Sequence, residues 1–451
     1  MGSLLSAPNL DKDTAGASTA FVAYGCAAHQ GWRTTMEDAH ALIAALDSGS
    51  PDGDGADGDS AAPAPPPRAF FAVYDGHGGP DVAHYCARHL HRTLCATAEY
   101  ARGDFAHALE LAYVATDAQL AAPAGQRELA AIYEELSGDA TTTGDASSST
   151  QNPAATWTWG NNSGSSSNRS NSSGPMGERK KRGSAEEQGC TAVAVLLDFA
   201  GGQLYCANAG DSRAVAVRGG VCAALSSDHK PGAAEELARI ERAGGFVRGG
   251  RVNGNLNLSR TLGDLCYKHN AALGPGEQVI SCVPDVRAAP LDAALDFVVL
   301  ACDGVWDVLS CADAAACVRA LLLPSTLADP ALRERLQKPF STSDSDTDDD
   351  EGGGSDDSKQ ESGSSGKDDD DDDKDVQPWP GDVATSLEEL LQLAAARLID
   401  RCVSHEASPF TVGCDNMTAI IVLPRSGTFA LRVQDALNER LKKQQQQRET
   451  K

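Results

Sequence analysis

The stretch FFAVYDGHGGPD, residues 70–81, joins an apolar run to residues that could perform chemistry. The run AFFAVY predicts a buried strand, and it stops at Asp75 and His77, which are interleaved with glycines. A carboxylate can bind a metal ion, and an imidazole can exchange a proton near neutral pH. Gly76, Gly78 and Gly79 have no side chains, so backbone carbonyls and a substrate can come close. The stretch therefore predicts a functional site at the end of a strand.

Other carboxylates also stand at the boundaries of apolar runs. They are Glu37 and Asp38 before AHALIAAL, Asp211 after CANAG, Asp303 after VVLAC with Asp307 four residues on, and Asp415 just before TAIIVL. Like charges crowded at one end of a sheet repel unless something positive lies between them. An all-oxygen cluster suits Mg²⁺ or Mn²⁺ better than zinc, which prefers His and Cys. Each aspartate taken alone could equally be a turn former or a helix cap.

The elements that must position these residues are short strands with helices between them. Apolar runs predict strands at 69–74, 191–198, 203–208, 212–217, 296–301 and 418–423. Amphipathic or capped patterns predict helices at 81–94, 232–243 and 386–403, the last opening with a capping box. Several strands are separated by turns too short for a helical crossover. The pattern therefore predicts an α+β fold in α/β/β/α layers, with two stacked, mainly antiparallel sheets flanked by helices.

Two low-complexity insertions interrupt this pattern. Residues 137–185 are dominated by Ser, Asn, Gly and Thr, and residues 341–380 form an acidic Ser/Asp/Gly tract. Both bury too little apolar surface to offset chain entropy, so we expect them to be disordered. Between Asp344 and Asp375 there are sixteen acidic residues and three lysines, half of the net charge of −26. The tract is either a solvated spacer or an arm that recruits basic proteins, and the overall charge disfavours direct nucleic-acid binding.

Eight motifs in order resemble those of the metal-dependent Ser/Thr protein phosphatases, the PPM or type 2C family. They are GWRTTMEDAH (31–40), FFAVYDGHGG (70–79), GCTAVAVL (189–196), ANAGDSRAV (207–215), SSDHKP (226–231), RVNGNLNLSRTLGD (251–264), ACDGVWDVL (301–309) and GCDNMTAIIV (413–422). The resemblance spans about residues 21–424. It implies a phosphatase domain over 21–424, with an N-terminal arm at 1–20 and a polar C-terminal tail at 425–451. Val433, Leu437 and Leu441 in that tail predict a marginal helix lying on the domain.

The resemblance also implies a role for each site residue. Asp75 corresponds to the carboxylate that bridges two metals, the Gly76 carbonyl to a ligand of one, and Asp303 and Asp415 to ligands of the other. The remaining residues have supporting roles: Glu37 and Asp38 hold metal-bound waters, Asp211 and Asp307 surround a weaker third metal, Arg33 grips the substrate phosphate and His77 is the general acid. The implied reaction is hydrolysis of phosphoserine and phosphothreonine esters by a binuclear metal-activated water, without a covalent intermediate.

Two departures from the family pattern are small. Cys190 replaces the usual Ser or Thr, and the turn at Gly413–Asn416 is tighter than common forms. Neither removes a ligand. Two rival functions stay open: a pseudophosphatase that binds through the acidic tract, and a binuclear hydrolase of small phosphoesters. The complete ligand set argues against the first, but the second differs only in substrate.

Other features bear on partners and location. Thirteen cysteines without a CxxC pair predict reduced thiols, with Cys190, Cys206 and Cys302 in the core. No secretory signal or apolar span is evident, so we expect the protein in the cytoplasm, the nucleus or both. We also expect it to be a monomer. MGSLLS fits a myristoylation motif at Gly2, and a single acyl chain there would give only weak membrane contact.

Overall fold

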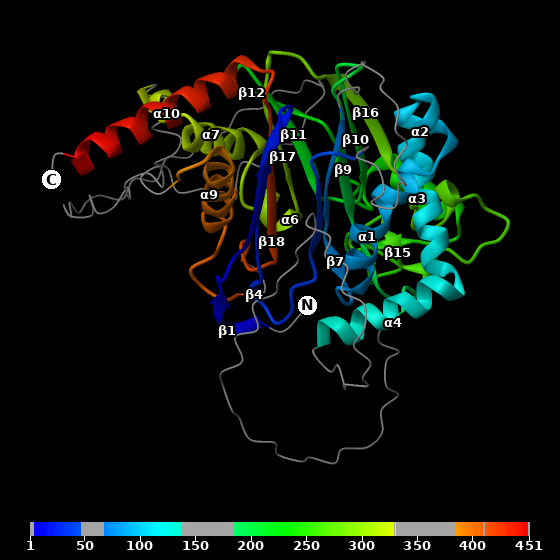
Figure 1. Cartoon of the computed structure of the whole chain (residues 1–451). Helices are drawn as coiled ribbons and strands as arrows, with labels where there is room; N and C mark the ends of the chain where they lie inside the picture. Colours follow the sequence, from blue (N-terminus) through cyan, green and yellow to red (C-terminus); the bar gives the residue numbers. More distant parts are fainter. Residues whose placement is uncertain are drawn as a thin grey trace, which may run out of the picture.

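Two antiparallel β-sheets lie face to face at the centre of the fold (Figure 1). The computed structural model describes residues 4–46, 67–137, 184–328, 330, 384–408 and 411–449. One sheet has five strands, in the order β16 (Asp285–Pro290), β10 (Gln203–Ala209), β9 (Ala192–Asp198), β6 (Arg68–Tyr74) and β5 (Ala39–Ile43). The other has six, in the order β12 (Val221–Ala224), β11 (Arg213–Arg218), β17 (Leu295–Ala301), β18 (Met417–Pro424), β3 (Val22–His29) and β2 (Asp13–Ser18).

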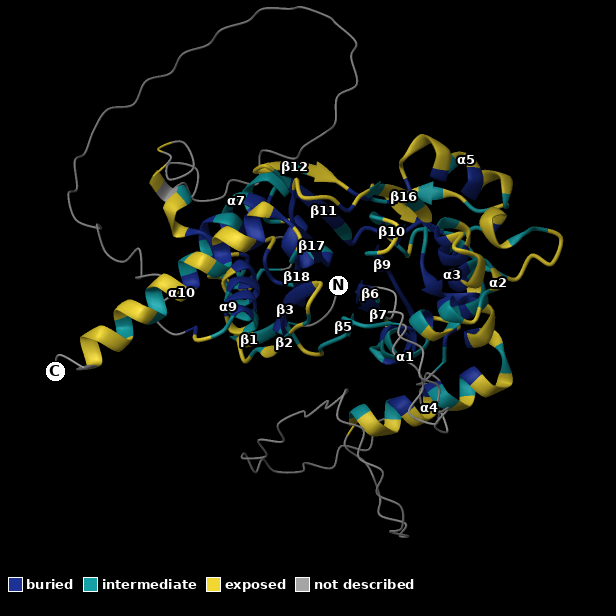
Figure 2. Cartoon of the chain, turned by 45° about the horizontal axis from the view of Figure 1, so that its top comes forward, coloured by how far each residue is buried: buried dark blue, intermediate teal, exposed yellow. Residues whose placement is uncertain are grey.

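Strand alternation gives each sheet two buried faces. In β6, Phe71 and Val73 point into the core between the sheets, whereas Phe70 and Tyr74 face the opposite way, toward helices. Successive side chains of a strand alternate between its faces, so a strand covered on both sides is apolar throughout. Figure 2 shows the resulting dark interior of the central strands. This explains why the central strands read in the sequence as uninterrupted apolar runs.

Helices cover the outer faces of both sheets. The five-stranded sheet is covered by α1 (Asp81–Cys95) and α3 (Phe105–Ala121), with the short α2 (Ala98–Arg102) between them in the chain, and α4 (Pro123–Ser137) packs against α1 and α3. The six-stranded sheet is covered by α7 (Cys311–Leu322), α9 (Leu387–Asp400) and α10 (Thr428–Glu449). The layers are therefore α/β/β/α, and the predicted α+β class with stacked antiparallel sheets is confirmed.

Smaller elements complete the end of the sheets where the predicted site residues lie. A three-stranded sheet has the order β15 (Leu262–Gly263), β8 (Gly189–Cys190) and β7 (Gly76–His77). The four-residue helix α6 (Asp303–Trp306) follows β17. A separate lobe contains α5 (Ala234–Arg242) and the hairpin of β13 (Val247–Arg248) with β14 (Arg251–Val252).

The expected N-terminal arm at residues 1–20 is corrected by the structure. Strand β2 pairs with β3 from Asp13 to Ser18 and forms the edge of the six-stranded sheet, and β1 (Leu4–Asn9) pairs with β4 (Gly31–Arg33). The apolar content of this segment is low, because an edge strand buries little of its surface. Residues 4–18 are thus part of the folded domain.

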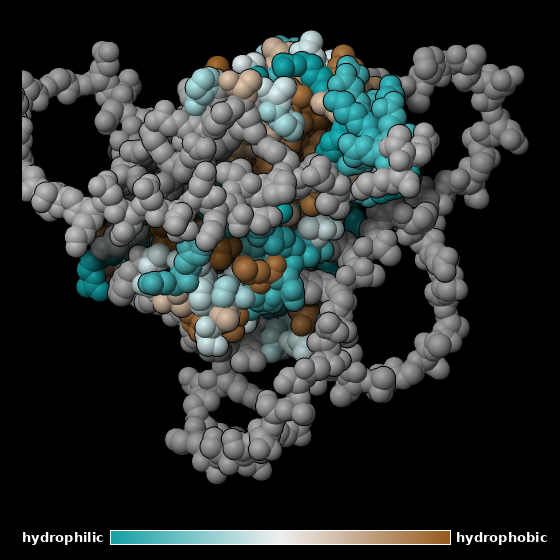
Figure 3. Space-filling model, turned by 90° about the vertical axis from the view of Figure 1, so that its left-hand side faces the viewer, coloured by the Kyte–Doolittle hydropathy of each residue, from teal (hydrophilic) through white to brown (hydrophobic). Residues whose placement is uncertain are grey.

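The expected polar tail at 425–451 is also revised. Helix α10 begins at Thr428, and its Phe429, Val433 and Leu437 are buried in the core beneath the six-stranded sheet. Figure 3 views the molecule from the left-hand side of Figure 1, and on this face brown hydrophobic residues are interspersed with teal hydrophilic ones. The predicted spacing of apolar residues identified the helix, and the structure shows that it docks.

The predicted insertions at 137–185 and 341–380 lie outside the described residues, apart from Ser137, Ser184 and Ala185. Gly2 also lies outside them. Within the described part of the chain, no helix combines the length and the apolar composition needed to cross a membrane.

Candidate active site

The predicted carboxylates come from strand ends of both central sheets. Asp75 directly follows β6, and Asp211 follows β10 after one intervening glycine. Asp303 begins α6 just after β17, and Asp415 stands two residues before β18. Because β17 and β18 run antiparallel, the last residue of β17 and the first residue of β18 lie at the same end of the sheet. The fold thus brings together side chains that are hundreds of residues apart.

Burial and mutual repulsion dominate the chemistry of this cluster. Burial raises the pKa of Asp75 well above its usual range, and the charges of Asp303 and Asp38 raise it further. Burial also raises the pKa of Asp303 well above normal, with added repulsion from Asp211. For Asp307 the pKa is raised by burial too, although the cation of Lys230 opposes the shift. These carboxylates therefore lie close enough to repel one another, and the cations of the protein neutralise only part of their negative charge.

Asp38 is a buried member of the cluster. Burial raises its pKa to about 7, although the Thr418 hydroxyl donates a hydrogen bond of 2.7 Å to its Oδ2. The second carboxylate oxygen, Oδ1, is buried without a hydrogen-bond partner. An unpaired buried carboxylate oxygen is costly unless a cation, a proton or water satisfies it.

Two cations from the chain lie against the outer members of the cluster. The Arg33 guanidinium forms an ion pair with Asp415, and the Lys230 ammonium forms one with Asp211. Burial alone would lower the pKa of Lys230, but the charge of Asp211 raises it above its ordinary value. Lys230 therefore stays charged at neutral pH and neutralises part of the site.

Gly76 and Glu37 meet at a point where no side chain fits. A Cβ atom on Gly76 would lie 2.3 Å from the Glu37 carbonyl oxygen, a distance that real contacts do not reach. The Glu37 carboxylate accepts hydrogen bonds from the Thr35 hydroxyl (3.0 Å) and the Gly79 N–H (3.3 Å). The glycine at position 76 is thus required by the close approach of two backbones, as the sequence suggested.

His77 is held by a carboxylate that the sequence analysis did not single out. Its Nε2 lies 2.7 Å from Oδ2 of Asp264, 187 positions away in the chain. Burial alone would lower the pKa of His77, but Asp264, together with the charges of Glu37 and Asp211, raises it. Burial would raise the pKa of Asp264, but His77 and the Thr261 hydroxyl hold it below its usual value. The pair therefore favours an imidazolium facing a carboxylate.

Backbone contacts fix the strand ends that carry these groups. Thr191 brackets Asp75: its hydroxyl accepts from the Asp75 N–H at 3.2 Å, and its N–H donates to the Asp75 carbonyl at 2.9 Å. Asn416 ties three segments together, because its amide donates to the carbonyls of Gln30 and Thr35 and accepts from the Glu37 N–H. These hydrogen bonds hold the site residues on rigid backbone.

Lys230, Asp264, Thr191 and Asn416 were not predicted as site residues. All four lie inside the quoted motifs, but their positions in those motifs carry no chemical signal until the fold supplies a partner. Cys190, the departure from the family pattern, is buried, and its Sγ lies 3.7 Å from that of Cys86. Cys206 and Cys302 are buried as well, so these three thiols lie in the core as predicted.

The donor set fits a hard divalent cation. Among the described residues, no three His, Cys, Asp or Glu side chains are arranged to hold a metal ion as they stand. Two of the expected ligands, Asp415 and Asp211, are instead engaged by Arg33 and Lys230. The donors are nevertheless all oxygen, Asp38 has an unsatisfied carboxylate oxygen, and the glycine at 76 exposes backbone. The chemistry of the donors therefore fits a hard divalent cation such as Mg²⁺ or Mn²⁺.

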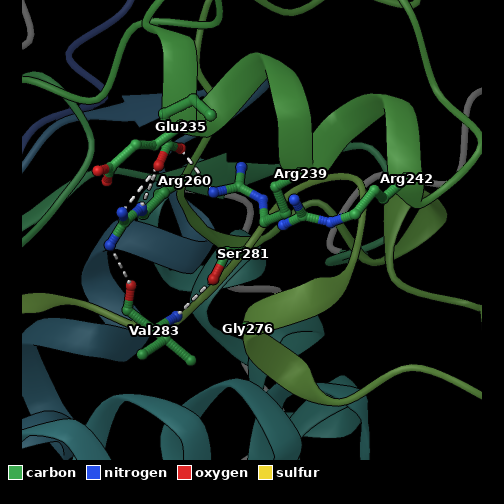
Figure 4. A pocket seen from close by; sticks show the side chains of 8 residues that line it. Glu235, Arg239, Arg242, Arg260, Gly276, Ser281 and Val283 are labelled. Atoms are coloured by element: carbon green, nitrogen blue, oxygen red, sulfur yellow. Dashed lines mark hydrogen bonds and ion pairs between the residues drawn. The ribbon is translucent and has the colours of Figure 1, made fainter.

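A separate pocket of about 210 Å³ lies beside α5 and contains none of the predicted site residues (Figure 4). The buried Glu236 forms ion pairs with Arg239 (2.6 Å) and Arg260 (2.7 Å). Arg239 also donates to the carbonyls of Ser259 and Gln278. These arginines are engaged in holding the lobe together, so the pocket is a structural feature distinct from the carboxylate cluster.

The fold thus has four layers, with a cluster of carboxylates at the ends of both central sheets. A family model described as Protein phosphatase 2C matches residues 22–141 and 158–342. The curated "Probable protein phosphatase 2C 60" of Arabidopsis thaliana is 37% identical over 315 residues, which cover 69% of this chain and 78% of that protein. The chain belongs to the protein phosphatase 2C family, and it is a metal-dependent protein serine/threonine phosphatase.

Two further similarities were found, one to a relative in sequence and one to a solved structure in fold. "Protein phosphatase 2C homolog 3" of Schizosaccharomyces pombe is 36% identical over 307 residues, covering 68% of this chain and 56% of that protein. A solved structure described as "Structure of a C.elegans sex determining protein" matches with a TM-score of 0.50 and 19% identity. That match covers 94% of this chain and 68% of the other, and it concerns the fold alone.

Proposed function

We propose that this phosphatase hydrolyses phosphoserine and phosphothreonine esters with a water activated by two divalent metal ions, Mg²⁺ or Mn²⁺, and without a covalent intermediate. The observation that carries the proposal is the cluster of Asp38, Asp75 and Asp303. Burial raises the pKa of each, and the charges of neighbouring carboxylates raise it further, so the charged forms need cations that the chain supplies only in part.

The metal ions would be held by Asp75, the Gly76 carbonyl, Asp303 and Asp415. Glu37 and Asp38 would act through water, and Asp211 with Asp307 would surround a weaker third ion. When bound, the ions would supply the positive charge that lowers the pKa of the attacking water and offsets charge on the phosphoryl group. Oxygen ligands of this kind serve either metal, so the choice between Mg²⁺ and Mn²⁺ rests on supply in the cell.

Arg33 is proposed to bind the phosphate. Its side chain is 41% exposed and its present partner is Asp415, a proposed metal ligand. A guanidinium has five N–H donors, so it can exchange the carboxylate for two phosphate oxygens at modest cost. Arg33 would then hold the phosphoryl group beside the carboxylate cluster.

His77 is proposed to protonate the departing serine or threonine oxygen. An alkoxide is a poor leaving group, so a proton delivered as the P–O bond breaks contributes about 10²–10⁴ in rate. The Asp264 carboxylate favours the protonated imidazole that this role requires. The proton lost by His77 is restored from solvent after each turnover.

The experiment compares substrates on one metal-loaded preparation. Phosphothreonine and phosphoserine peptides are assayed beside free phosphorylated metabolites of small size, with Asp75→Asn as the matched inactive variant. We expect kcat/KM on the peptides to exceed that on the metabolites by at least about 10²-fold, with Asp75→Asn inactive on both. A preference for the small phosphoesters would show that the protein is a metabolite phosphatase instead.

A further inference from the structure

The segment 259–268 places the buried carboxylate of Asp264 beside His77. Asp264 has a side chain only 3% exposed, and its Oδ2 lies 2.7 Å from His77 Nε2. The same oxygen accepts a 2.7 Å hydrogen bond from the Thr261 hydroxyl. Oδ2 of the buried Asp264 side chain thus contacts both His77 and Thr261, which belongs to the same turn as Asp264.

The backbone at Asp264 needs support to keep this position. Its φ of 50° and ψ of 42° lie in the left-handed region, which residues other than glycine adopt uncommonly. Its N–H donates 2.8 Å to the Gln188 carbonyl, which holds the turn against the segment leading into β8. A residue in this region persists only when its surroundings hold it there.

That support comes from helix α3 through Asp117. Oδ1 of Asp117 accepts hydrogen bonds from the Gly263 N–H (2.8 Å) and from Lys268 Nζ (2.7 Å). Lys268 also donates to the Thr261 carbonyl at 2.8 Å. The side chains of Asp117 and Lys268 are 10% and 7% exposed, so this ion pair is screened little by solvent. Together they fasten both sides of the turn to α3.

We propose that Asp264 is a positioning residue for His77, and that the Asp117–Lys268 ion pair keeps Asp264 in place. The inference rests on the proposed function, in which His77 protonates the leaving oxygen. A carboxylate bound to Nε2 restricts the rotation of the imidazole ring and leaves Nδ1 as the nitrogen that can donate to the leaving oxygen. The bond to Asp264 thus sets the direction in which His77 presents its proton.

The test uses leaving-group dependence. Asp264→Asn keeps the shape of the side chain but removes its charge. We expect kcat on a phosphothreonine peptide to fall about 10–100-fold, part of the range for a lost general acid. On p-nitrophenyl phosphate, whose leaving group needs no proton, the loss should stay within about 3-fold. Equal losses on the two substrates would overturn the proposal, because a purely structural or metal-holding role affects both.

A double-mutant cycle shows whether Asp264 acts through His77. If it does, Asp264→Asn added to His77→Ala should cause no further loss on the peptide, whereas independent roles would add their losses. If His77→Ala alone were equally harmful to both substrates, the acid role and its positioning would fall together. If His77→Ala lowered turnover mainly on the peptide but Asp264→Asn lowered it equally on both substrates, only the positioning role of Asp264 would be refuted.

Variants of the ion pair test the second half of the proposal without altering the carboxylate itself. Asp117→Asn and Lys268→Met should lower peptide turnover about 3–30-fold with the same selectivity, and they provide the test if Asp264→Asn does not fold. Asp296 in β17 is a matched control, because it also accepts one backbone N–H, from Gly220 at 2.8 Å, and pairs with one cation, Arg319 at 3.5 Å. Asp296→Asn should lower stability but leave the ratio of the two substrates unchanged. If Asp117→Asn and Lys268→Met also left the ratio of the two substrates unchanged, the proposed role of the ion pair would be refuted.

Discussion

Replacing Asp38 with asparagine should stabilise the metal-free protein at alkaline pH. Asp38 is 5% exposed, and burial raises its pKa to about 7. Because this value lies above the unfolded value of about 3.9, the native state binds the extra proton. Stability is therefore lost as the pH rises from about 4 to about 7, and above that the full cost of the buried charge remains.

The size of the effect follows from the two pKa values. A folded pKa of about 7 against an unfolded pKa of about 3.9 costs about 4 kcal/mol at pH 8 and about 1–2 kcal/mol at pH 5. Asparagine does not titrate, and its carbonyl can still accept the hydrogen bond from Thr418. The other carboxylates are present in both proteins. The difference between wild type and Asp38→Asn should thus grow by about 2–3 kcal/mol from pH 5 to pH 8.

The assay is urea unfolding in EDTA at both pH values, followed by circular dichroism. In saturating Mg²⁺ the order should reverse, because the metal compensates the Asp38 charge and the variant loses part of that stabilisation. A metal-free difference that does not change between pH 5 and pH 8 would refute the assigned burial cost. So would a variant less stable than wild type in EDTA at pH 8.

Further outcomes test the remaining site residues and the acidic tract. Asp303→Asn should lower kcat on a phosphopeptide by about 10²-fold or more while far-UV circular dichroism stays native, and near-native turnover in saturating metal would rule out a ligand role. Arg33→Lys should lower kcat/KM about 10-fold or more because the guanidinium fork is lost, and an unchanged kcat/KM would exclude phosphate binding. Deleting 341–380 should leave kcat on a neutral peptide unchanged but alter turnover of a basic protein at low salt, an effect that fades as salt screens the charge. Unchanged turnover of the basic protein would make the tract a spacer.

The strands that could be predicted are the apolar ones. All six predicted runs match a strand of the central sheets to within one residue at either end. Strand β3, with the sequence VAYGCAAH, was not predicted, because small residues give little β signal. The structure supplies the reason for the small residues: a Cβ on Gly25 would lie 2.2 Å from the Leu391 backbone of α9. The small residues of β3 thus make room for the backbone of α9, a long-range contact that the local sequence pattern does not indicate.

The site was predictable to the extent that its chemistry is local. Asp75 and Asp303 could be predicted because each follows an apolar run. The resemblance to the phosphatase family added the other expected metal ligands. The carboxylate that holds His77 is 187 positions away, and Lys230 approaches Asp211 only because a loop returns to the end of β10. Neither contact has a spacing or a composition that distinguishes it from an ordinary surface charge. Such pairs become visible only when the fold is known.

The most direct test of the metal-dependent mechanism is a titration of the metal-stripped, full-length protein with Mn²⁺. Turnover of a phosphothreonine peptide and the number of bound ions per chain are measured together. We expect turnover to be at background without metal, to rise as about two ions bind per chain, and to disappear again with EDTA. Asp75→Asn should bind fewer ions and stay at background. Full turnover in the metal-stripped protein would contradict the proposed mechanism.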